Sequence, residues 1–207
     1  MNIVRSIGLF LIGTLILALG INLANIANLG IAVYDAYVLN LAEVSGMSFG
    51  TMSITMGVLL VIAQLVISRK WQMSYLAQLA IALVISFILD FFMYTVFAGI
   101  YIDSFMLQVV YFVLANITIC LGIAMVLSAR LQSFPLETTM NLIHQKYFIS
   151  ISKIKYGFDA LWLILAIVIG MVGGLETLHI GLGTLVMFSL HGWLINYFYK
   201  NLTHILH

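Results

Sequence analysis

Charge is scarce in this sequence. Lys, Arg, Asp and Glu make up 7% of its 207 residues, whereas 64% are hydrophobic. A soluble domain of this length needs a far larger share of charged side chains, so the composition excludes that class and is typical of an integral membrane protein in a lipid bilayer. The eight basic residues form no patch large enough for nucleic acid, so we expect no nucleic-acid partner.

Cysteine and proline each occur once, as Cys120 and Pro135. A single cysteine permits neither an intrachain disulfide nor a cysteine metal cluster. The sequence also lacks a phosphate-binding glycine loop and a Ser/His/Asp set on loops. We therefore expect no enzyme activity, no metal site and no cofactor.

Long apolar runs recur along the chain. A bilayer core about 30 Å thick needs about 20 apolar residues in a helix. Six stretches meet or approach this length, which predicts six transmembrane helices. The stretches are residues 7–27, 50–68, 75–96, 106–128, 155–173 and 178–198.

The basic residues fall on one side of this predicted arrangement. With six spans, all eight lie at the termini or in the second and fourth connections. They are Arg5, Arg69, Lys70, Arg130, Lys146, Lys153, Lys155 and Lys200. The only charged residues in the other connections are acidic, namely Asp35, Glu43, Asp103 and Glu176. Because basic residues favour cytoplasmic loops, we expect both termini in the cytoplasm.

The two halves of the sequence resemble one another. Residues 19–67 align without a gap on residues 121–169, which puts Asp35 on Glu137, and residues 86–94 overlay 192–200, which pairs Asp90 with Asn196. Repeats with an odd number of spans insert with opposite orientation, as in many transporters. The sequence thus predicts an all-α membrane domain of six transmembrane helices as a 3+3 inverted repeat, with residues 1–104 and 105–207 as its halves.

Each half has an extra short helix between its first two spans. Apolar residues recur at helical spacing in residues 31–43 and 133–147, which predicts amphipathic helices. Ser133 is a candidate N-cap and Pro135 fits the first turn. In the first copy Asn28 or Gly30 marks the break, and Gly30 is the candidate helix start. Two placements stay open: flat on the membrane surface, or re-entrant as a half-helix buried in protein.

Residues 28–60, NLGIAVYDAYVLNLAEVSGMSFGTMSITMGVLL, resemble the first repeat of the YczE/YyaS/YitT-like bacterial integral membrane proteins. That family has L-G-x-S-P-W-D followed by G-x-S-F-G-T. The matching residues are Leu29, Gly30, Asp35, Gly46, Ser48, Phe49, Gly50 and Thr51. Val33 and Tyr34 replace the family's proline and tryptophan, whereas Pro135 survives in the second copy. The resemblance implies a bacterial plasma-membrane protein of poorly defined activity.

Polar residues in or beside the spans are candidates for a substrate- or ion-binding site, because an ionisable group in hydrocarbon costs about 2.5–3.5 kcal/mol. Asp90 has two readings, as a cavity-lining group or as a structural hydrogen-bond acceptor, and His191 likewise fits a proton relay or a packing role. The full candidate set is Asp35, Asp90, Glu137, Asn196, Asn22, Asn25 and His191.

We expect a membrane transporter or channel-like protein for a small solute. Acids without basic partners at the outer face favour a cationic or zwitterionic solute and leave proton coupling open. Two alternatives remain: an accessory or assembly membrane protein without transport activity, and a membrane-embedded substrate-binding subunit that needs an energising partner. A homo-oligomer or a partner membrane protein is compatible with each.

Overall fold

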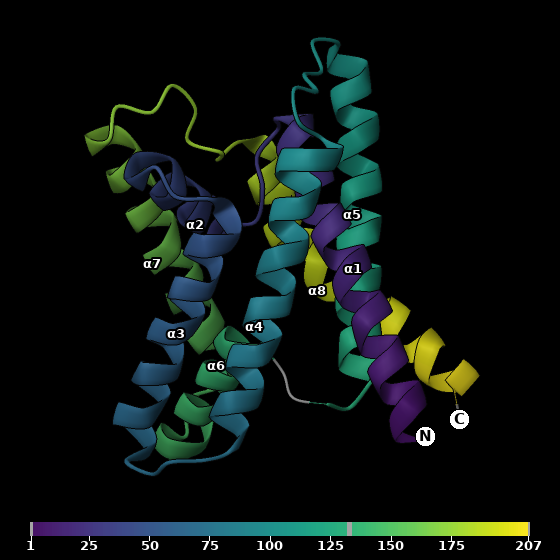
Figure 1. Ribbon diagram of the computed structural model, residues 1–207, viewed down its shortest axis with the longest axis vertical. Helices are drawn as coiled ribbons and strands as arrows, with labels where there is room; N and C mark the ends of the chain where they lie inside the picture. Colours follow the sequence, from purple (N-terminus) through teal and green to yellow (C-terminus); the bar gives the residue numbers. More distant parts are fainter. Residues whose placement is uncertain (1, 132–133, 207) are drawn as a thin grey trace. The chain divides into compact units, whose positions relative to one another are not determined.

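The computed structural model describes residues 2–131 and 134–206, and it is helical throughout, with no strand in these ranges (Figure 1). The elements, in chain order, are α1 (Ile3–Ala27), α2 (Val33–Ser45), α3 (Phe49–Ser68), α4 (Ser74–Phe91), the π-helix η1 (Phe92–Val96), α5 (Phe105–Ser128), α6 (Pro135–Tyr147), α7 (Ile151–Val172) and α8 (Leu182–Leu206).

Five helices in the described ranges are long and apolar enough to cross a membrane: α1, α3, α4 continued by η1, α5 and α7. This confirms the all-helical fold with several helices of membrane-spanning length and composition. At 25 residues α8 is long enough, but it is not among the five. Polar residues such as His191 and Asn196 interrupt its apolar run. The sixth span therefore stays a prediction.

The chain divides into two compact units. Unit 1 comprises Met1–Asp35, Ile88–Leu131 and His179–His207, and unit 2 comprises Ala36–Phe87 and Gln132–Leu178. Each unit thus combines segments from both predicted halves of the sequence. The boundary between the units falls inside α2 and inside α4, so each of these helices contributes to both.

In unit 1, α1 and α5 pack along their length as an antiparallel pair. Gly13 faces Met125 and Val126, and Gly20 faces Ile119. A Cβ atom on Gly20 would lie 2.7 Å from the Ile119 backbone nitrogen, so only glycine permits this approach. Small residues at a helix crossing are typical of membrane packing. Helix α8 packs against α5, and both chain termini lie at one end of the unit (Figure 1).

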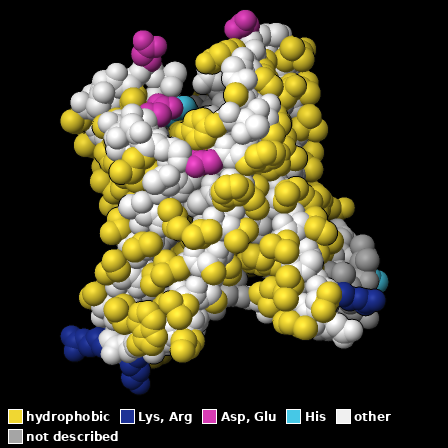
Figure 2. All heavy atoms as spheres, in the orientation of Figure 1, with side chains coloured by type: hydrophobic (Ala, Val, Ile, Leu, Met, Phe, Trp, Pro, Cys, Tyr) yellow, Lys and Arg dark blue, Asp and Glu magenta, His cyan; other side chains and the backbone are white. Residues whose placement is uncertain are grey.

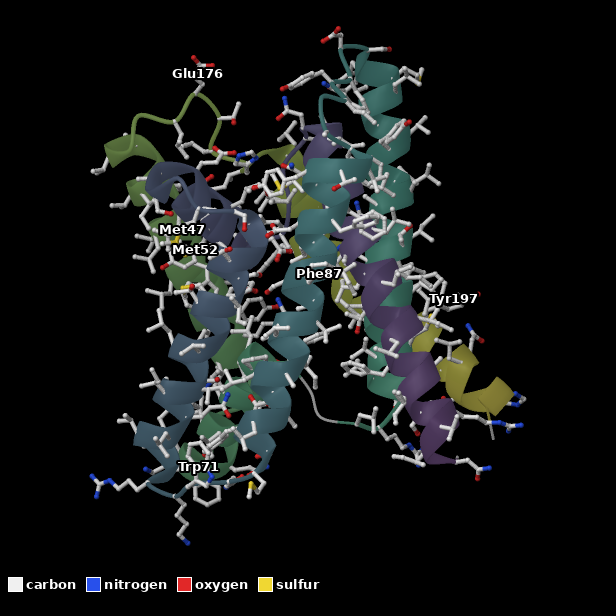
Figure 3. The ribbon with its side chains drawn as sticks, in the orientation of Figure 1. Met47, Met52, Trp71, Phe87, Glu176 and Tyr197 are labelled. Carbon is white, nitrogen blue, oxygen red and sulfur yellow. The ribbon has the colours of Figure 1, made fainter. Side chains whose placement is uncertain are left out.

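In unit 2, two short helices lie along two long ones. Helix α6 packs against α3, and α2 contacts α7 through its side chains. The α3–α4 connection is a short turn from Arg69 to Met73. Glu176, which follows α7, and Trp71, in this turn, lie at opposite ends of the unit (Figure 3).

Basic residues collect at one end of each unit. In unit 2 the Lys146 Nζ donates a hydrogen bond to the Ile67 carbonyl, beside Arg69. In unit 1 the antiparallel packing of α1 on α5 brings Arg5 to the same end as Arg130. On the visible face, Lys and Arg side chains lie only toward these ends (Figure 2). The position of the basic residues at one end of each unit agrees with the sequence prediction that they all lie in connections on one side of the membrane.

Candidate functional site

The first turn of α6 begins inside unit 2. Pro135 occupies the first turn, as expected, and needs no hydrogen-bond acceptor because it has no N–H group. The candidate N-cap Ser133 lies outside the described residues. The residue that precedes α6 is Phe134, whose side chain makes no capping hydrogen bond. The remaining N–H groups of this turn therefore need other acceptors.

Two glutamines anchor this turn. The Gln64 Nε2 of α3 donates to the Gln78 Oε1 of α4 at 2.8 Å, and the Gln78 Nε2 donates back to the Gln64 Oε1 at 3.1 Å. The same Gln64 Nε2 lies 3.1 Å from both the Pro135 carbonyl oxygen and the Thr139 hydroxyl. Gln64 and Gln78 are completely buried. We call Gln64, Gln78, Pro135 and Thr139 the α6 anchor.

Glu137 lies in the same turn as the α6 anchor. Its Oε2 atom is completely buried and has no hydrogen-bond partner within residues 2–131 and 134–206, although the residue as a whole is only half-buried. The backbone N–H of Glu137 donates to its own carboxyl group. Burial raises the pKa of this carboxyl from its usual 4.5 to about 7, and the backbone hydrogen bond opposes the shift.

Helix α6 runs beside the C-terminal half of α3. A Cβ atom at Gly57 would lie 3.8 Å from the Pro135 ring, and Gln64 binds the Pro135 carbonyl. Gly57 and Gln64 lie eleven and four residues before the end of α3 at Ser68, which is about 16 and 6 Å at 1.5 Å per residue. The other end of α6 reaches the end of α3, where Lys146 binds the Ile67 carbonyl. The first turn of α6 is thus level with the interior of α3.

Helix α2 runs beside the C-terminal half of α7 in the same way. The Tyr37 ring stacks on Trp162 with ring centroids 5.0 Å apart. The buried Asn40 Nδ2 donates to the carbonyls of Ala166 and Leu178, both at 3.0 Å. Trp162 lies ten residues before the end of α7 at Val172, about 15 Å along the axis. The α2 segment that begins at Ala36 is therefore also level with the interior of a long helix.

Unit 1 holds a second polar region beside η1. The buried Asn22 Nδ2 of α1 donates to the Ala18 carbonyl at 2.9 Å and to the Leu89 carbonyl at 3.3 Å. This brings Asn22 next to Asp90, the candidate that follows Leu89. Two residues later the helix changes from α to π. Such π segments often occur at functional sites.

The other candidates are more dispersed. Asp35, half-buried in the first turn of α2, and Asn25 belong to unit 1, as does Asn196, which is exposed. The His191 Nε2 lies 3.0 Å from the Asn116 Oδ1, which joins α8 to α5. The structure therefore brings Asn22 together with the backbone beside Asp90.

Gly30 has a backbone requirement of its own. Its φ of 103° is a conformation that side chains rarely adopt, and a Cβ atom there would lie 2.5 Å from the Gly181 backbone nitrogen. Neighbouring backbone groups join the same segments, since Ile31 donates to the His179 carbonyl and Gly183 to the Leu29 carbonyl. Gly30 thus lies in the middle of the α1–α2 connection, three residues before α2 begins at Val33, and packs closely on the segment before α8.

The α6 anchor is the feature that sequence reasoning missed. In the sequence, Gln64 and Gln78 are isolated polar residues in the predicted spans 50–68 and 75–96. Their positions carry a usable signal, because each lies seven residues from Trp71 at the centre of the α3–α4 turn. Antiparallel neighbours at equal distances from a tight turn face each other, so the pairing follows once the hairpin is recognised. The described residues hold no group of three or more His, Cys, Asp or Glu able to bind a metal ion.

Comparison with known proteins now adds to the geometry. The model of DUF6198, a family of unknown function, matches residues 4–200. The uncharacterized protein YyaS of Bacillus subtilis (strain 168) is 29% identical over 187 residues, which cover 90% of this chain and 89% of YyaS. No solved structure matches the chain. The resemblance to YyaS-like proteins is thereby confirmed, and the chain belongs to the DUF6198 family of unknown function.

Proposed function

We propose that the protein is a transporter or channel-like protein for a small solute in the bacterial plasma membrane, built on two inverted repeats with α2 and α6 as re-entrant half-helices. The observation that carries this proposal is the pair of short helices in unit 2. The part of α2 in this unit and α6 each start beside the interior of a long helix and run to its end. These contacts support the re-entrant placement over one flat on the membrane surface.

Element boundaries support the duplication. Helices α1, α2 and α3 start at Ile3, Val33 and Phe49, and the starts of α5, α6 and α7 each follow 102 positions later. Residues outside the helices agree. The left-handed residues Asn28 and Gly46 have φ of 52° and 69°, and their counterparts Arg130 and Phe148 have φ of 53° and 56°. A shared offset at so many points supports one duplicated structural pattern.

Contacts between α1 and α5 support a two-fold relation between the copies. A Cβ atom on Gly20 would meet the Ile119 nitrogen at 2.7 Å and the Ala115 oxygen at 3.2 Å. A Cβ atom on Gly122 would meet the Leu17 nitrogen at 2.6 Å and the Gly13 oxygen at 2.8 Å. Adding or subtracting the same 102 positions converts the first set into the second. Such an exchange is expected where two copies pack around a two-fold axis.

The half-helices suggest where a solute binds. In transporters with inverted repeats, discontinuous helices bring their N-terminal ends and free backbone groups to the middle of the membrane. Here the first turns of α2 and α6 carry Asp35 and Glu137, the only acids of their respective helix starts. Carboxyl groups offset the positive helix ends and favour a cationic or zwitterionic solute. The basic ends of the units support cytoplasmic termini.

Reconstitution tests the proposal. Purified protein in liposomes is given an inward pH gradient and radiolabelled choline as the cationic probe or glycine as the zwitterionic one. We expect uptake of at least one probe above that of protein-free liposomes, and a loss of more than half of it in Asp35→Asn combined with Asp90→Asn. Asp103→Asn, in an exposed connection, is the matched control. Absence of uptake together with a partner that co-purifies in fixed ratio would instead support the accessory role.

A further inference from the structure

We propose that Glu137 is a proton-binding site of this protein, which takes up and releases one proton at its buried Oε2 atom. The proton comes from water and returns to water, so no other reactant is needed. That this proton drives solute movement rests on the proposed function, whereas proton binding itself does not.

Geometry is the first argument for this site. The Oε2 atom is completely buried and has no hydrogen-bond partner among the residues that the structure describes, and the turn that carries it is fixed by the α6 anchor. A purely structural acceptor at a buried helix start would use both oxygens on N–H groups, as the carboxyl does with its own backbone N–H. An orphaned carboxylate oxygen is costly to bury, whereas a protonated one is much less so.

The surroundings are the second argument, since the elements packed against α6 offer Glu137 no counter-charge. Helix α3 has no ionisable side chain. On α7, Lys155 pairs with Asp159 at 2.5 Å. On α4, the Tyr75 hydroxyl lies 2.8 Å from the Ser68 hydroxyl.

The remaining ionisable groups lie toward the ends of these helices, and on α4 the other one is an acid, Asp90, one residue before the end of the helix. On α6 itself, Lys146 binds the Ile67 carbonyl and His144 contacts the Ile149 carbonyl at 2.7 Å. Tyr147, Lys153 and Tyr156 are exposed. With no cation beside it, the carboxyl loses its charge on burial, which agrees with the raised pKa of about 7. A small change in access to water is then enough to move the proton at physiological pH.

Infrared spectroscopy of the whole protein in lipid tests this site without a solute. The pH is stepped from acid to alkaline, and the C=O stretching band of protonated carboxylic acid is followed. We expect a band that disappears with a midpoint near 7 in the wild type, is missing in Glu137→Gln, and is kept in Glu176→Gln, an exposed control. If the band with a midpoint near 7 persists in Glu137→Gln, the proposal is overturned. The wild-type spectrum is itself decisive if Glu137→Gln does not fold, since no titrating band near neutral pH also overturns it.

Coupling to transport is tested separately in the liposome assay. If choline or glycine uptake depends on the pH gradient, we expect Glu137→Gln to lose that dependence while exchange of probe at equal pH on both sides persists. Uptake by Glu137→Gln that still follows the gradient overturns the coupling role. If the infrared band is lost in Glu137→Gln but the wild type shows no uptake, the proton site stands and the transporter proposal does not. The two proposals therefore fail independently.

Discussion

Gln64 and Gln78 exchange two hydrogen bonds across the α3–α4 hairpin, and Gln64 extends the pair to the first turn of α6. We expect Gln64→Leu to lower the free energy of unfolding by about 2 kcal/mol, because it leaves the buried Gln78 amide without its partner. The Pro135 carbonyl loses one of its two donors and keeps the Thr139 hydroxyl. Thermal unfolding in detergent micelles measures the effect. Gln72→Leu, in the exposed turn, is the control.

The double variant Gln64→Leu with Gln78→Leu separates pairing from burial. Replacing both partners removes the unsatisfied amide, so the double variant should be more stable than Gln64→Leu alone. If the stability loss of the double variant equalled the sum of the losses of Gln64→Leu and Gln78→Leu, a direct interaction between the two side chains would be contradicted. Helix-to-helix hydrogen bonds in bilayers average about 0.6 kcal/mol, so a much smaller loss in the single variant would also argue against our reading of a fully desolvated cluster.

Gly30→Ala should destabilise the protein by about 1–3 kcal/mol, because its φ of 103° is unfavourable for alanine and the new Cβ meets the Gly181 nitrogen. Gly8→Ala is the matched control in the same unit. Gly8 lies inside α1, with no atom within 4 Å of the added Cβ. Alanine there should stabilise the helix by about 0.5–1 kcal/mol. Equal melting temperatures for the two variants would contradict the left-handed backbone conformation and close packing at Gly30.

Gly20→Ala and Gly122→Ala should lower stability by similar amounts, about 1–3 kcal/mol each, since both added Cβ atoms press on backbone of the facing helix. Gly192→Ala, inside α8 with no atom within 4 Å of the added Cβ, should not destabilise and should, like Gly8→Ala, stabilise its helix by about 0.5–1 kcal/mol. Melting temperatures of the three variants in one detergent give the comparison. A loss at only one of the two crossing glycines would count against the proposed two-fold relation.

The protein should lose stability as the pH rises, because of the titration of Glu137. Its pKa is about 7 in the folded protein against 4.5 in the unfolded chain. Between these values the unfolded chain releases the proton first, so the folded state binds more protons and loses stability as the pH rises. The loss is complete above about pH 7 and amounts to about 3 kcal/mol. Melting temperatures of the wild type minus those of Glu137→Gln should follow this curve, and a constant difference from pH 4 to 8 would rule it out.

Much of the fold follows from the sequence. Apolar length predicts five helices that match α1, α3, α4, α5 and α7, and periodicity predicts two short helices where α2 and α6 occur. These signals are local, since each depends on consecutive side chains facing lipid or protein. The sixth predicted span falls mostly in α8 and stays a prediction, because His191 and Asn196 interrupt the apolar run of this helix.

The candidate site was less predictable, because its contacts join distant segments. Composition drew attention to Glu137, but not to its orphaned oxygen, which depends on how α6 packs. In the sequence, Asn40 is one more polar position of an amphipathic helix. In the structure its amide donates to the carbonyl of Ala166 in α7 and to that of Leu178 in the α7–α8 connection. Periodicity shows which face of a helix is polar, and it does not show what that face meets.

Membrane orientation gives the last prediction, through accessible cysteines. Each unit has an acidic end, marked by Asp103 or Glu176, and a basic end, marked by Lys200 or Arg69. Basic ends remain in the cytoplasm because their translocation is unfavourable. We expect a membrane-impermeant maleimide to label Asp103→Cys and Glu176→Cys in intact bacterial cells. Arg69→Cys and Lys200→Cys should react only after the cells are made permeable.

The wild type supplies the control for this experiment, because its single cysteine, Cys120, is buried. Labelling of Lys200→Cys in intact cells, with Asp103→Cys protected, would reverse the orientation. Equal labelling at both ends would mean insertion in both directions, which the one-sided distribution of the eight basic residues argues against. An odd number of spans would be revealed by opposite labelling of Arg5→Cys and Lys200→Cys. Agreement between these two therefore tests whether α8 crosses the membrane, the point that its hydropathy leaves open.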